Sequence, residues 1–129
     1  MGEIKSYRDL DVWQLGMELV VECYAVTRRF PGDERFGLTS QIRRAAVSIP
    51  SNVAEGHNRR SPQSNNAYRN HVSIALGSSG ELDTNLEVVL RLGYVRPTDL
   101  AVLKERLARV GQMLRRLQQS LECSSQPGR

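Results

Sequence analysis

The sequence predicts an all-α protein, an up-down-up-down antiparallel bundle of four helices with a kink in the second helix at Pro50. Three observations predict this fold. Apolar residues recur at alternating intervals of three and four in four segments, and breaks containing Pro or Gly separate these segments. The 129 residues are 40% hydrophobic but only 5% aromatic. A chain of this length forms one core, so we expect a bundle domain over residues 1–123 and a flexible tail over residues 124–129.

The first helix is expected over residues 9–29 and is unusually apolar. Its apolar positions form two adjacent stripes that cover roughly 220° of the helix, more than the ~100° that a surface helix needs. A bundle hides one stripe, so the second requires cover from another subunit. The residues predicted to form this subunit contact are Val12, Leu15, Leu19 and Val26.

The second helix is expected over residues 36–59, after a break at Phe30, Pro31 and Gly32. Its apolar residues keep a helical period, but Pro50 lies within it. Proline cannot donate the hydrogen bond that the Ala46 carbonyl would accept, so a kink or break is expected between these two residues.

The third and fourth helices are expected over residues 62–92 and 97–122, and the short loop between them makes them antiparallel neighbours. The pair Ser61 and Pro62 suits a cap followed by a first turn. Gly77 and Gly80 each cost about 1 kcal/mol of helix propensity relative to Ala. They therefore predict that a neighbouring helix approaches closely, with a local break in the helix as the alternative.

The composition favours no catalytic or metal-binding function. The chain contains no glycine-rich phosphate loop, no zinc-binding helix motif and no nucleophile elbow, so we expect no enzyme activity, cofactor or metal. Cys23 and Cys123 fit no ligand spacing and are interpreted as reduced thiols. With no apolar signal region or membrane span, a cytoplasmic protein is expected.

His57 and His71 are assigned surface or cap roles, because they are fourteen residues apart with no Cys nearby. A polar stripe on the second helix is more informative. At helical spacing it is compatible with a solvated face, a polar network between helices, or a ligand-binding face. Its members are Arg44, Ser48, Ser51, Glu55 and Arg59.

The charge of the chain is concentrated between residues 28 and 69. Overall the net charge is +4, but this segment alone carries eight Arg and three acidic residues, a local charge of +5. Arg engages phosphate through two parallel hydrogen bonds, which Lys cannot do. An alternative is that these arginines reflect coding bias, because Arg outnumbers Lys throughout the chain. The predicted nucleic-acid-binding residues are Arg43, Arg44, Arg59, Arg60 and Arg69.

Four stretches resemble a known family: residues 10–14 (LDVWQ), the break at residues 30–34, residues 41–56 (QIRRAAVSIPSNVAEG) and residues 75–82 (ALGSSGEL). They are similar to bacterial four-helix-bundle proteins associated with intervening sequences of 23S rRNA genes. The resemblance extends to the accessory variability protein of diversity-generating retroelements. It implies a basic, barrel-like homopentamer that binds nucleic acid and a reverse transcriptase. Residues 57–66 depart from the family pattern, which leaves the start of the third helix open.

Three classes of function compete. The first is a non-enzymatic oligomeric adaptor that binds structured RNA or an RNA–DNA duplex through Arg. The second is a helix-turn-helix DNA binder formed by residues 41–60, which requires two short helices instead of one. The third is a scaffold for a protein partner, supported by the apolar first helix.

Overall fold

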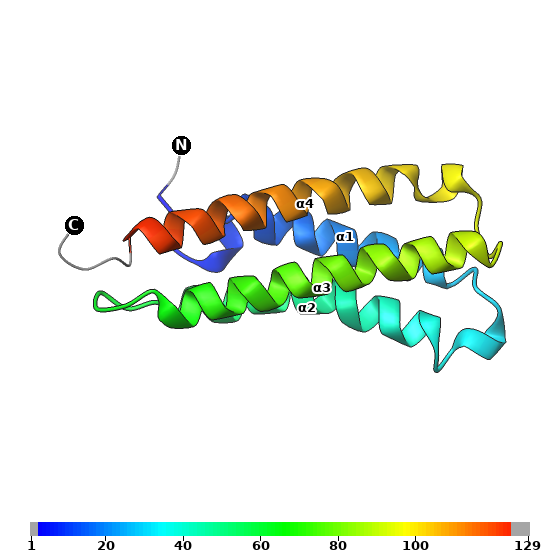
Figure 1. Ribbon diagram of the computed structural model, residues 1–129, viewed down its shortest axis with the longest axis horizontal. Helices are drawn as coiled ribbons and strands as arrows, with labels where there is room; N and C mark the ends of the chain where they lie inside the picture. The colour runs from blue at the N-terminus through cyan, green and yellow to red at the C-terminus, as the bar shows by residue number, and fades with distance from the viewer. Residues whose placement is uncertain (1–2, 125–129) are drawn as a thin grey trace.

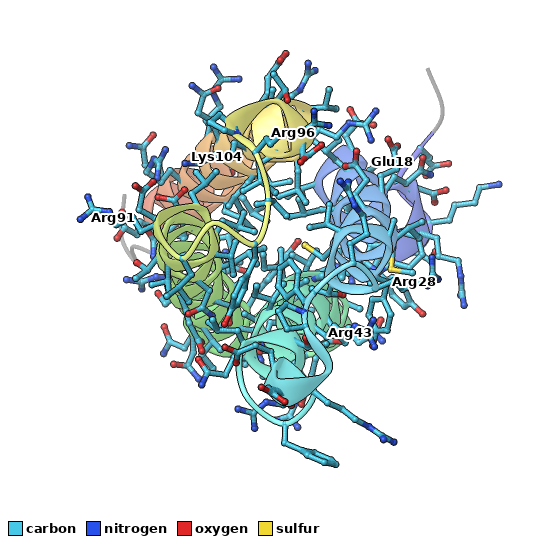
Figure 2. The ribbon with its side chains drawn as sticks, turned by 90° about the vertical axis from the view of Figure 1, so that its right-hand side faces the viewer. Glu18, Arg28, Arg43, Arg91, Arg96 and Lys104 are labelled. Atoms are coloured by element: carbon cyan, nitrogen blue, oxygen red, sulfur yellow. The ribbon has the colours of Figure 1, made fainter. Side chains whose placement is uncertain are left out.

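A computed structural model describes residues 3–124, and within them it shows two 3-10 helices, η1 (Tyr7–Asp9) and η2 (Gly32–Glu34), four α-helices and no strand. The α-helices form the body of the molecule. These are α1 (Asp11–Thr27), α2 (Leu38–Asn58), α3 (Asn66–Arg91) and α4 (Pro97–Ser124). They run up-down-up-down, as Figure 1 shows. Seen end on, α1 and α3 occupy opposite corners, each between α2 and α4 (Figure 2). The predicted bundle is confirmed.

One core fills the space between the four helices, and each helix contributes to it at the predicted intervals. Its largest fully buried side chains include Leu19, Ile42, Ile49, Leu82, Leu86, Leu100 and Leu114. Cys23 also lies in this core as a free thiol, and burial raises its pKa to about 12. The thiol is therefore protonated and unreactive at neutral pH.

Helix α2 continues without interruption through Pro50. Figure 1 shows the first turns of α2 diverging from α3, whereas the later part of α2 lies along it. The ring of Pro50 is buried against Gly16 of α1, where an added Cβ would lie 3.5 Å from the proline ring. Because α2 is one helix and not two, the helix-turn-helix interpretation of residues 41–60 is wrong.

The beginning of α3 and its glycines differ from the prediction. The helix begins at Asn66 instead of residue 62, because Ser61 and Ser64 bond to each other and close a turn before it. An added Cβ would meet nothing within 4 Å at Gly77 or Gly80, so the predicted close approach does not occur there, and the helix is not broken either. The close approach is at Gly56 of α2 instead.

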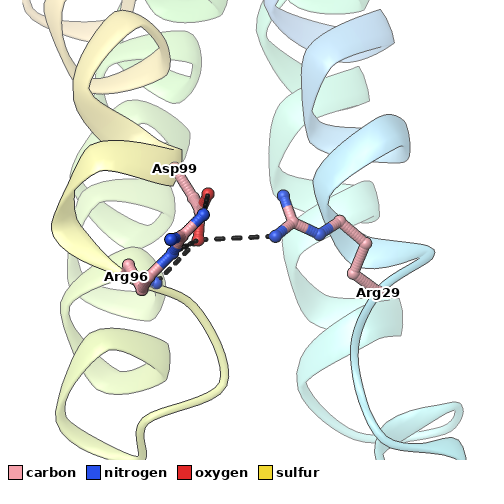
Figure 3. A network of polar contacts seen from close by, with 3 residues as sticks. All are labelled: Arg29, Arg96 and Asp99. Carbon is pink, nitrogen blue, oxygen red and sulfur yellow. Dashed lines mark hydrogen bonds and ion pairs between the residues drawn. The ribbon is translucent and has the colours of Figure 1, made fainter.

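Ionic and aromatic contacts connect the region where α1 ends to the region where α4 begins. Asp99 of α4 accepts a 2.8 Å hydrogen bond from the backbone N–H of Arg96 and pairs with Arg29 at 3.5 Å (Figure 3). The Arg96 amide and then its side chain hold the pKa of Asp99 below its usual range. Nearby, Phe30 packs against Tyr94 with ring centroids 5.8 Å apart. The turn after α3 is made by Gly93, whose φ of +77° favours glycine.

No helix in the described part of the chain combines the length and apolar character needed to cross a membrane. Ser124, the first residue of the predicted tail, belongs to α4, and the rest of that tail lies outside the described residues. The side chain of Cys123 lies outside the description too.

Candidate functional site

A groove of about 640 Å³ runs over the N-terminal half of α2 and the adjoining part of α1. It is open to solvent, and its lining combines cationic, aromatic and hydroxyl side chains. Three lining residues are Arg and none is acidic, so the groove is suited to an anion. The lining comprises Tyr24, Arg35, Phe36, Thr39, Ser40, Arg43, Arg44, Val47 and Ser48.

Arg43 is fixed in this groove by neutral partners. Its Nε donates a 2.8 Å hydrogen bond to Oγ1 of Thr27, and its guanidinium carbon lies 4.4 Å from the centroid of the Tyr24 ring. Thr27 is itself buried and donates to the Cys23 carbonyl at 2.7 Å. The guanidinium is therefore oriented before any ligand arrives, and four of its five N–H groups remain for other acceptors.

The other two arginines of the groove are exposed. Arg44 faces outward because α2 buries Ile42, Ala45 and Ala46 on its opposite side. Arg35 lies over the ring of Phe36, 5.2 Å from its centroid, in the loop that leads into α2. Among residues 3–124, none of the three groove arginines forms an ion pair with a carboxylate. Their positive charge is thus uncompensated by direct pairing.

The five arginines predicted from the sequence do not form one cluster. Arg59 pairs with Glu55 at 2.9 Å, and Arg60 donates a 2.6 Å hydrogen bond to the His57 carbonyl. Arg69 lies 3.9 Å from a carboxylate oxygen of Glu122. Arg59, the C-cap of α2, is fifteen residues beyond Arg44, which corresponds to roughly 22 Å along the helix axis. Only Arg43 and Arg44 line the groove.

The end-on view also shows that the arginines of the chain are distributed over different sides of the bundle (Figure 2). Arg28 and Arg43 lie on the side of α1 and α2, whereas Arg91 lies away from them beside α3 (Figure 2). Arg35 and Phe36 complete the groove but were not singled out from the sequence. Arg35 lies in the predicted break, and Phe36 was expected as the first residue of the second helix, whereas the structure places both in the loop before α2.

The polar stripe predicted on α2 divides into two parts. Ser48 shares a 2.8 Å hydrogen bond with Ser78 of α3, and Glu55 lies 3.8 Å from Nε2 of His71. Asn52 connects these contacts, because its amide group bonds to both Ser48 and His71. The inter-helix network is therefore confirmed for Ser48 and Glu55. Arg44 and Ser51 are exposed instead.

The two histidines have structural surroundings. His57 is buried, contrary to the predicted surface or cap role, and meets the Tyr68 ring edge-on at 5.8 Å. Burial and then the charge of Arg60 lower its pKa below 6.5. His71 is part of the network between α2 and α3, with Nδ1 2.9 Å from Oδ1 of the Asn52 side-chain amide.

The predicted subunit contact on α1 requires correction. Val12 and Leu19 are buried within the bundle itself, and Leu15 and Val26 are partly buried against the same core. They do not need cover from a second subunit, because the core lies between the two apolar stripes instead of under one of them. On α1 and α2, the exposed large apolar side chains are Met17 and Val21, 40% and 67% exposed, and Val47 at 40%.

Comparisons with known proteins agree with this architecture. A family model described as 23S rRNA-intervening sequence protein matches residues 8–116. A crystal structure of a protein of unknown function from the S23 ribosomal protein family of Bacteroides thetaiotaomicron superposes with a TM-score of 0.74 and 20% identity. The match covers 83% of this chain and 97% of that one, and shows a shared fold. No curated protein matches the sequence. The chain belongs to the 23S rRNA-intervening sequence protein family.

Proposed function

We propose that the protein is a non-enzymatic, oligomeric adaptor that binds structured RNA or an RNA–DNA duplex through the groove on α2. One observation carries this proposal: three guanidinium groups lie along an open groove that has no acidic residue in its lining. Guanidinium groups bind phosphate oxygens through paired hydrogen bonds. A polyanion is the ligand that gains most from several such groups in one groove.

Binding by one chain is expected to be weak, because only a few phosphates can be engaged at once. In an oligomer, identical grooves can contact one nucleic acid together, and the effective concentration of the second groove raises the overall affinity. This gain in affinity requires that two grooves of the oligomer can contact the same nucleic acid at the same time.

Salt titration tests the proposal. Affinity for a structured RNA, followed by fluorescence anisotropy, should fall steeply as salt rises from about 50 mM to about 200 mM, because binding releases counterions. The double variant Arg35→Ala/Arg44→Ala should bind more weakly and reduce the slope of log affinity against log salt by about one unit for each lost phosphate contact.

A matched control removes the same charge elsewhere. Arg91 and Arg116 are exposed on α3 and α4, so Arg91→Ala/Arg116→Ala should leave affinity and slope nearly unchanged. Arg59→Ala/Arg60→Ala tests the second group of arginines, which already have intramolecular partners, and should have a smaller effect than the groove variant. Absence of binding to RNA, DNA or hybrid at about 50 mM salt would overturn the proposal.

The exposed apolar side chains favour a second role, contact with protein. Met17 and Val21 are large apolar side chains of α1 left in water, and neither belongs to the lining of the groove. We propose that another copy of the chain covers them, as a homopentamer in keeping with the family resemblance. Light scattering checks the mass, and a 14.5 kDa particle at micromolar concentration would contradict assembly.

A further inference from the structure

Phe36 is the most exposed large apolar side chain in the described part of the protein, at 87%. Single exposed apolar residues are common on protein surfaces. This one differs in its position, because it lines the cationic groove and carries the Arg35 guanidinium 5.2 Å from its ring centroid. An aromatic face beside a cation is a combination that proteins use to stack nucleobases.

The loop that carries Phe36 is held in place by several hydrogen bonds. The carboxylate of Glu34 accepts from the backbone N–H of Leu38 at 3.1 Å and from the hydroxyl of Tyr94 at 2.6 Å. The N–H of Gly37 also donates to the Glu34 carbonyl at 3.0 Å. Phe36 therefore projects from a fixed turn, and its exposed ring needs little ordering when a ligand binds.

A duplex does not offer a free base face to such a ring, because internal bases stack on their neighbours. Unpaired bases in loops, bulges and single strands can turn outward and stack on a protein aromatic side chain. The groove that Phe36 lines has a volume of about 640 Å³, and its lining includes the hydroxyl-bearing residues Thr39 and Ser40. Their hydroxyl groups can donate to and accept from base edges or sugar.

We infer that the groove binds an unpaired nucleotide, with its base stacked on Phe36 and the adjoining phosphates held by Arg35 and Arg44. This inference rests on the proposed function and narrows it. Within a structured RNA, the contacted element is a loop, bulge or free strand, and paired stems contribute only through their phosphates.

Three RNA probes of related sequence test this assignment. They are a hairpin with an open loop, the loop sequence as a single strand, and a blunt duplex of the same length as the hairpin. The hairpin and the single strand should bind more tightly than the duplex. Phe36→Ala should weaken binding of the looped and single-stranded probes by about tenfold, as expected for loss of one stacked base. Phe36→Trp should retain binding.

Two readouts separate stacking from electrostatic attraction. Phe36→Ala should leave the slope of log affinity against log salt unchanged, because the ring neutralises no phosphate, whereas Arg35→Ala/Arg44→Ala should lower it. A fluorescent base analogue in the loop should change its emission on binding to the wild type but not to Phe36→Ala. Leu92→Ala removes a 53% exposed apolar side chain at the C-cap of α3 and serves as the matched control without effect.

The outcomes distinguish this inference from the proposed function. Equal binding of duplex and looped probes, together with no effect of Phe36→Ala, overturns the stacking assignment and leaves the arginine groove in place. Absence of binding to every probe overturns both the stacking assignment and the proposed function. Dissociation of an oligomer by Phe36→Ala would show that another subunit covers the ring, and would also overturn the assignment.

Discussion

The hydroxyl group of Tyr94 donates a 2.6 Å hydrogen bond to Oε2 of Glu34, a residue sixty positions earlier in the chain. The other carboxylate oxygen of Glu34 accepts from the backbone N–H of Leu38, at the first residue of α2. One carboxylate thus connects the loop between α3 and α4 to the start of α2. The Tyr94 hydroxyl and then the Leu38 amide lower the pKa of Glu34, while the bond to Glu34 raises the pKa of Tyr94.

We predict that Tyr94→Phe lowers the melting temperature and weakens the acid dependence of stability. The pKa of Glu34 is lower in the folded protein than its ordinary value of 4.5. Its stabilising contribution is therefore complete above that value and is lost as the pH falls through the folded pKa. Thermal unfolding of wild type and variant at a series of pH values between about 3 and 7 measures this. Identical profiles for the two proteins would contradict the prediction.

Two glycine substitutions should have opposite effects on stability. A Cβ at Gly56 would lie 2.8 Å from Cβ of His71 and 2.9 Å from Cδ1 of Tyr68, so Gly56→Ala should destabilise the fold by about 1–3 kcal/mol through overpacking. A Cβ at Gly77 meets nothing within 4 Å, so Gly77→Ala should stabilise α3 by up to about 1 kcal/mol. Urea unfolding gives both free energies. A stabilising Gly56→Ala would show that the α2–α3 contact is not as close as described, and a destabilising Gly77→Ala would contradict the open surroundings of Gly77.

Glutamate at two neighbouring positions of α1 should separate folding from assembly. Leu19 is 0% exposed in the bundle core, so Leu19→Glu should destabilise the fold by about 4 kcal/mol or more, because the carboxylate would have no buried partner. Val21 is 67% exposed, so Val21→Glu should retain the helical far-UV spectrum. If Val21 lies at a subunit contact, the second variant should dissociate the oligomer in light scattering. An unchanged mass would remove Val21 from that contact.

Mild acid should destabilise the protein through His57. Its pKa is lower in the folded protein than its ordinary value of 6.5, mainly because the ring is buried. Below that value the unfolded chain binds the proton more readily, so stability is complete above it and is lost as the pH falls toward the folded pKa. Urea unfolding at about pH 7.5 and about pH 5.5 should show this loss, and His57→Gln should reduce it. A pH-independent wild type in this range would refute the prediction.

The helices could be predicted from the sequence because a single core imposes one period on each of them. Leu82, Leu86 and Val89 of α3 are buried at the intervals that the sequence predicts. The beginning of α3 could not be predicted in the same way. Ser61 and Pro62 are equally suited to a helix start and to a turn, and the bonds between Ser61 and Ser64 select the turn.

The orientation of α1 was predictable only in part. A helical wheel identifies all its apolar positions, but the neighbouring helices determine which of them face the core. Gly16 packs against Pro50 and Cys23 is buried, which directs Leu19 inward and leaves Val21 outside. Glycines are difficult to interpret from the sequence for a similar reason. The helix propensity of glycine is equally low at Gly56 and Gly77, but of these two only Gly56 lies close to a neighbouring helix.

The candidate site was predictable as a basic segment but not as a groove. Arg43 and Arg44 could be selected by charge, whereas the contact between Arg43 and Tyr24 depends on how α1 and α2 pack. Arg59 and Arg60 had the same appearance in the sequence. Their engagement with Glu55 and His57 becomes apparent only in three dimensions.

The up-down-up-down order also determines how the protein can be handled in an experiment. The described chain begins and finishes at one end of the bundle, whereas η2 and the first turns of α2 lie at the opposite end (Figure 1). A tag, fluorophore or surface linker attached at either terminus is therefore separated from Phe36 by much of the length of the bundle. Immobilising the protein through such a tag should leave the arginine groove accessible to a nucleic acid in solution.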